Sequence, residues 1–79
     1  MFTRTKRHYE VLAYTNPTRE PWPTEKTTRK ADALRIGAGW AVRFPRVEVN
    51  VVYTAADDEN DIQGAELLAA WEHGTKTTK

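Results

Sequence analysis

Residues 28–53, TRKADALRIGAGWAVRFPRVEVNVVY, decide the fold because they contain the clearest helix and the clearest strand of the chain. From Thr28 to Phe44, apolar residues recur at helical spacing along two neighbouring stripes, which predicts a helix lying on a sheet. Pro45 ends this helix, since the residue before a proline avoids the α region. Residues 46–54, RVEVNVVYT, alternate valine with polar residues, and this alternation predicts a strand.

Two features of this unit predict that other parts pack against it. Gly37 and Gly39 lie inside the predicted helix, where each glycine costs about 1 kcal/mol relative to alanine. A close approach of the helix to the sheet, or to another chain, would offset that cost. Val52 breaks the alternation by placing an apolar group on the polar face of its strand. We therefore expect a further element or a partner molecule to cover that face.

The segment before the helix predicts two more strands. Residues 8–15, HYEVLAYT, have the composition of a strand. Leu12 and Tyr14 in this strand again place apolar groups on the face away from the helix. Residues 24–28, TEKTT, predict a short strand, and the prolines just before it predict an edge position.

The C-terminal third predicts a second helix. Apolar residues within 59–73 recur at helical spacing, and the acidic residues at its start suit the positive end of a helix. His73-Gly74 then predicts a helix stop. The chain would form a small two-layer α/β (α+β) domain in the order β-(β)-α-β-α, with two or three strands. If the strands at 8–15 and 46–54 are neighbours joined through the helix, they run parallel with a right-handed crossover, and a strand at 24–28 makes the sheet mixed.

The length of 79 residues allows a single domain, 1–79, with flexible tails at 1–7 and 75–79. Such a short chain buries a modest core, and a homodimer interface would add stability. There is no cysteine, which excludes disulfides and thiolate metal sites. No apolar run reaches the length of a membrane span and the N-terminus has no signal-peptide pattern, so we expect a cytoplasmic protein without membrane contact.

The residue types of the chain do not favour a catalytic site or a metal site. The chain has neither serine nor cysteine, and its two histidines, His8 and His73, lie near opposite ends. The acidic residues at 57–61 lack the spacing and the glycine of a calcium loop. We therefore predict a non-enzymatic protein with no catalytic residue, cofactor or metal.

Protein binding is the leading hypothesis for function. Trp22 lies between two prolines and has no periodic reason to be buried, so it either holds its loop on the sheet or protrudes as an interface anchor. Together with the apolar groups on the outer face, it defines the predicted partner-binding residues: Trp22, Leu12, Tyr14 and Val52.

Binding to nucleic acid is the alternative. The first 30 residues carry seven Lys/Arg against three Glu, whereas the last 23 carry six acids against two Lys, within a total net charge of +1. Basic groups beside aromatic side chains are typical of proteins that bind single strands. The residues that would bind phosphate are Arg4, Lys6, Arg7, Arg19 and Lys26. The sequence pI of about 8.1 is lower than that of most dedicated binders.

Three segments also carry a resemblance. RHYEV at 7–11, TRKADAL at 28–34 and WAVRFPRVEVNVV at 40–52 resemble short uncharacterised proteins of bacteriophages that infect actinobacteria. The resemblance covers residues 7–53 and is structural, with no functional residues to transfer. It implies a small accessory protein that acts by binding a host or phage macromolecule.

Overall fold

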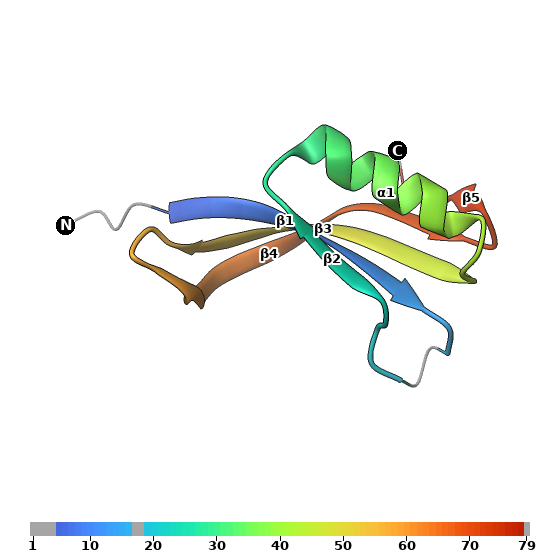
Figure 1. Cartoon of the computed structure of the whole chain (residues 1–79), viewed down its shortest axis with the longest axis horizontal. Coiled ribbons are helices and arrows are strands. Elements are labelled where there is room, and N and C mark those ends of the chain that lie inside the picture. Colours follow the sequence, from blue (N-terminus) through green and yellow to red (C-terminus); the bar gives the residue numbers. More distant parts are fainter. Residues whose placement is uncertain (1–4, 17–18, 79) are drawn as a thin grey trace.

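The structure of the chain, a computed structural model, describes residues 5–16 and 19–78. Within these residues, five strands form one sheet in the order β2-β1-β3-β4-β5, with every neighbouring pair antiparallel. One helix lies across one face of this sheet (Figure 1). The elements are β1 (Thr5–Tyr14), β2 (Thr24–Thr27), α1 (Lys30–Ala41), β3 (Arg46–Ala55), β4 (Asp58–Glu72) and β5 (Thr75–Lys76).

The predicted two-layer α/β domain is wrong, because the C-terminal third forms a strand instead of a second helix. Residues 59–73 lie almost entirely in β4, which pairs with β3 from Arg46 to Ala55. Alanine, leucine and glutamate favour a helix by less than about 1 kcal/mol per residue, and tertiary pairing readily overrides such a preference. Pairing with β4 completes the backbone hydrogen bonds of the valine-rich β3. The fold is therefore β-rich, with a single short helix in the described chain.

The direction of β3 also differs from the prediction. β1 and β3 are neighbours but run antiparallel. The reason is β2, which pairs antiparallel with β1 and so reverses the chain before it enters α1. The helix then connects β2 to β3, two strands that run the same way on either side of β1, as in a split β-α-β unit. The predicted strand at 24–28 is thereby confirmed, and its edge position as well.

The core lies between α1 and the covered face of the sheet. Val11, Val47 and Val49 are fully buried there, and Trp71 of β4 is nearly so. Ala33, Gly37 and Ala41 form the buried side of the helix. These small residues allow the helix axis to approach the valines closely.

Gly37 shows why a small residue is required at the centre of this contact. A Cβ atom at this position would lie 2.8 Å from the side chains of both Trp71 and Val49. The predicted close approach to the sheet is thus confirmed for Gly37. At Gly39 a Cβ atom would meet no described atom within 4 Å, so packing does not account for that glycine.

The helix is shorter than predicted at both ends, since it begins at Lys30 and ends at Ala41. At 12 residues it is too short to cross a bilayer, and no other helix in the described chain is long and apolar enough to do so.

The residues between α1 and Pro45 form a turn in which the N–H groups of Arg43 and Phe44 both donate to the Trp40 carbonyl oxygen.

No helix covers the opposite face of the sheet in the described chain (Figure 1). We call this side the open face. Leu12 and Tyr14 lie half-buried on it, whereas Val52 is only 3% exposed. Of the two expected covers, no further element of the described chain lies on this face, and a partner molecule stays a prediction. Most of the face is polar.

Both chain ends contribute to the sheet. β1 includes residues 5–7 and β5 includes residues 75–76, although both segments were predicted to be parts of flexible tails. Residues 1–4 and 79 lie outside the described residues. His73 and Gly74, with φ angles of 49° and 82°, form the two-residue turn between β4 and β5. The predicted helix stop is therefore a hairpin turn.

Candidate interaction surfaces

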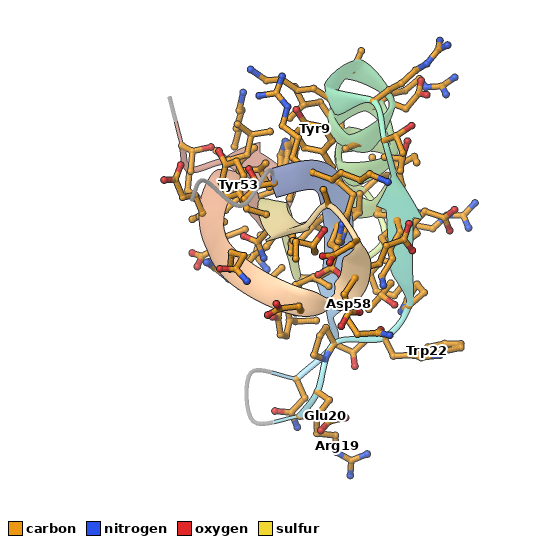
Figure 2. All side chains as sticks on the ribbon, turned by 90° about the vertical axis from the view of Figure 1, so that its left-hand side faces the viewer. Tyr9, Arg19, Glu20, Trp22, Tyr53 and Asp58 are labelled. Carbon is orange, nitrogen blue, oxygen red and sulfur yellow. The ribbon has the colours of Figure 1, made fainter. Side chains whose placement is uncertain are left out.

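Trp22 projects from the loop between β1 and β2, and its side chain is 79% exposed (Figure 2). Its backbone is nevertheless held in place. The Trp22 N–H donates to the Ala13 carbonyl oxygen at 2.9 Å, and the Ala13 N–H donates to the Pro23 carbonyl oxygen at 3.1 Å. A large aromatic side chain thus stands in solvent on a fixed support, and this excludes the prediction that Trp22 pins the loop onto the sheet.

The structure brings together three of the four predicted partner-binding residues. Trp22 and Pro23 lie opposite Ala13, so Trp22 is beside the end of β1 that carries Leu12 and Tyr14. Val52 is opposite His8, towards the other end of the strand. Because Val52 is also buried, it cannot contact a partner in this conformation.

The basic residues of the nucleic-acid hypothesis divide in a similar way. Lys6, Arg7 and Lys26 line a hollow of about 290 Å³ at the end of the sheet near the β3–β4 turn. Arg19 lies in the β1–β2 loop at the opposite end of β1 (Figure 2). Arg4 lies outside the described residues.

Acidic groups reduce the positive potential of that hollow. Glu59 belongs to its lining. The Lys26 ammonium is 3.9 Å from a carboxylate oxygen of Glu10, which also accepts from the His8 ring at 3.3 Å. The strongly acidic β3–β4 turn therefore lies beside the basic residues, an arrangement that repels phosphate as well as attracting it.

A second hollow, of about 470 Å³, lies on the open face at the other end of the sheet. Arg46 is at its centre and donates to Glu48 at 2.8 Å and also to Glu72. The hydrogen bond to Glu48 raises the pKa of Arg46. Burial raises the pKa of Tyr14 above its ordinary value of 10.0, and the negative charge of Glu48 raises it further, while Arg46 lowers it. Arg46 thus forms ion pairs with two carboxylates of the sheet, Glu48 and Glu72.

Within the described residues, no group of three or more histidine, aspartate or glutamate side chains is arranged so that it could hold a metal ion. The acidic residues at 57–61, predicted to cap a helix, instead surround a hairpin turn and the first residues of β4. Asp58 accepts from the backbone N–H of Asn60 at 2.9 Å, which is a local turn contact.

Sequence reasoning missed one surface entirely, the outer edge of β4. Residues 59–73 were predicted to form a helix, and the backbone groups of a helix form hydrogen bonds within their own segment. That prediction therefore leaves no unpaired strand edge in this part of the chain. The signal that could have found it is the hairpin pattern of an acidic turn after a valine-rich strand.

Comparison with protein-family models, with curated proteins and with solved structures finds no match for this chain.

Proposed function

We propose that the chain is a small, cytoplasmic, non-enzymatic protein-interaction module, and that Trp22 is the anchor of its partner-binding surface. The observation that carries this proposal is the 79% exposure of Trp22 on a backbone fixed by two hydrogen bonds to Ala13. A solvated indole forfeits the free energy that burial of its apolar area would release. Tryptophan is also enriched among the residues that dominate binding energy in protein interfaces.

The surroundings of Trp22 support the same proposal. The flanking prolines, Pro21 and Pro23, restrict the backbone, so the loop loses little conformational entropy on binding. Leu12 and Tyr14 offer half-buried apolar area on the adjacent end of β1. The resemblance to phage accessory proteins suggests that the partner is a protein of an actinobacterial host.

The test is affinity capture from a nuclease-treated actinobacterial lysate, with the wild-type chain, Trp22→Ala and Val42→Ala immobilised in parallel. Val42 is a matched control because it is 85% exposed but lies at the end of α1. Loss of an anchor residue costs at least about 2 kcal/mol, or roughly thirtyfold in affinity. We expect the captured protein to be lost with Trp22→Ala and kept with Val42→Ala.

Equal capture by Trp22→Ala and by wild type would contradict the assignment of Trp22. Circular dichroism of each variant checks that the sheet is intact. An exposed side chain that makes few contacts changes the free energy of unfolding by no more than about 0.5 kcal/mol when it is truncated.

Nucleic-acid binding is the second candidate, because Lys6, Arg7 and Lys26 line one hollow. It predicts that a labelled single-stranded oligonucleotide binds at low salt, that the affinity falls steeply with added salt, and that Lys6→Ala with Arg7→Ala weakens it. The adjacent Glu59 makes this candidate the weaker one. Failure to detect binding at low salt would remove it.

A further inference from the structure

β4 is much longer than the strand that pairs with its outer side. It has 15 residues, whereas β5 pairs only with Trp71 and Glu72. A hydrogen bond from the Thr77 N–H to the Ala70 carbonyl oxygen, and one from the Ala70 N–H to Thr78 Oγ1, extend that contact to Ala70. In the described chain, residues 58–69 of β4 therefore have no strand on their outer side, and we call them the β4 edge.

The hydrogen bonds of Ala70 show which backbone groups of the β4 edge face outward. Its N–H donates to Thr78 Oγ1 at 3.1 Å, and its carbonyl oxygen accepts from Thr77 at 2.8 Å, so both groups point away from β3. Outward and inward residues alternate along an antiparallel strand. The register skips one residue near Val49, after which Leu67 and Ala65 take the outward positions. Their N–H and carbonyl groups can accept another strand.

The side chains of the β4 edge are rich in acidic groups and include two exposed apolar groups. Four of its residues are acidic, namely Asp58, Glu59, Asp61 and Glu66, and no lysine or arginine occurs between Arg46 and Lys76. Ile62 and Leu67 are 63% and 50% exposed, although both are large and apolar. The β4 edge thus combines negative charge with two solvated apolar groups.

This charge decides which kind of strand fits. A second copy of the same edge would bring carboxylates against carboxylates, which is unfavourable for directly opposed residues. A strand with lysine or arginine at those positions would meet opposite charge, and its apolar residues could cover Ile62 and Leu67. Acidic residues along an edge also suppress uncontrolled pairing between like molecules.

We propose that the β4 edge binds an extended basic segment of a partner protein, in which Lys or Arg alternates with apolar residues, as an added strand of the sheet. The backbone groups of Ala65 and Leu67 supply the hydrogen bonds. The acidic side chains select the basic segment. This surface lies at the opposite edge of the sheet from β2 and Trp22, so it goes beyond the anchor proposed above.

The first test uses synthetic peptides as long as the β4 edge, with fluorescence anisotropy at low salt as the measurement. A lysine–valine alternating peptide is expected to bind, and its glutamate–valine counterpart is not. A lysine–valine peptide with N-methyl groups on alternate amides keeps the charge but cannot extend a sheet. Loss of one or more backbone hydrogen bonds predicts about tenfold weaker binding for it.

The second test changes the protein. Ala65→Pro removes an outward N–H, whereas the control Ala65→Val keeps it, so we expect about tenfold weaker peptide binding for the proline variant alone. Asp61→Asn with Glu66→Gln leaves the backbone intact and should weaken binding about fivefold. Trp22→Ala should leave peptide binding unchanged, which separates this proposal from the role of Trp22.

Two results would overturn the proposal. One is equal binding of the N-methylated and unmodified peptides, which would show attraction to charge without strand addition. The other is the absence of peptide binding at low salt. This includes the outcome in which sedimentation shows that wild-type molecules associate with one another and no peptide binds. Because the peptide comparison uses the unaltered chain, it holds even if Ala65→Pro fails to fold.

Discussion

On the face of the sheet under α1, alternate residues of β1, β3 and β4 are apolar or aromatic, whereas on the open face the same strands carry mostly charged and polar side chains. Val11 and Val49 pair across the covered face and are fully buried. On the open face, Glu10 pairs with Asn50, and both remain partly exposed. Successive side chains of one strand point to opposite faces, so neighbouring residues of the same strands form the two faces.

This difference shows how a single short helix can be enough for the fold. A face without a covering layer must be stable in water, and here polar and charged side chains contact one another along the strands. Arg46 contacts Glu48 and Glu72, and His8 contacts Glu10. Surface pairs of this kind each contribute up to about 1 kcal/mol, so the stability of the domain must come mainly from the covered face.

The strongest test of this comparison is the truncation of one large side chain on each face. Trp71→Ala removes a side chain that is 8% exposed under α1, and we expect the free energy of unfolding to fall by about 3–5 kcal/mol. Leu67→Ala removes one that is half-exposed, and we expect a loss below about 1 kcal/mol. Urea unfolding followed by circular dichroism measures both, and similar losses would mean that the open face carries a core of its own.

A finer test compares the two glycines of α1, of which only one faces the sheet. Gly37→Ala places a Cβ atom 2.8 Å from Val49 and Trp71, and we expect it to destabilise the domain by about 1–3 kcal/mol through overpacking. Gly39→Ala meets no described atom within 4 Å and should stabilise the domain by up to about 1 kcal/mol through helix propensity. Opposite signs in thermal unfolding would confirm that the helix contacts the sheet through Gly37, and equal shifts would contradict it.

The covered face could be predicted from the sequence because its signal is local. The alternation in residues 46–54 identifies side chains that the structure buries, including Val47 and Val49. The apolar stripes in the helix are confirmed only in part, because Ala33 and Ala41 are buried whereas Val42 is 85% exposed. The same local reasoning marked both glycines of the helix as sites of close approach, and it is correct for Gly37 but not for Gly39. These inferences use only residues that are near one another along the chain.

The open face and β4 could not be predicted in this way. Residues 65–70, AELLAA, favour a helix locally, and only pairing with β3 makes them a strand. That pairing also determines which backbone groups of β4 stay unpaired, so the proposed binding edge depends on it too. Trp22 was recognised as a candidate because of its prolines, but its exposure depends on where the hydrogen bonds to Ala13 place the loop.

The smallest expected effect concerns the charges of the open face. Burial, and then the charge of Glu48, raise the pKa of Tyr14 above 10.0, so the folded state holds this proton more tightly than the unfolded state does. The resulting stability is fully present below about pH 10 and is lost as the pH rises through the folded-state pKa. Because Tyr14 is partly exposed to solvent, we expect a loss below about 1 kcal/mol.

Urea unfolding between pH 9 and pH 11.5 can isolate this contribution if wild type is compared with Tyr14→Phe. The free energy of unfolding should fall more steeply with pH in wild type, since the phenylalanine variant has no proton to lose at that position. Glu48→Gln removes the negative charge that, in addition to burial, raises the pKa of Tyr14, so the ionisation of Tyr14, followed by ultraviolet absorbance, should shift to lower pH. Identical pH slopes for wild type and Tyr14→Phe would show that the open face at this position is as solvated as an unfolded chain, and the contrast between the two faces would then be larger than the structure indicates.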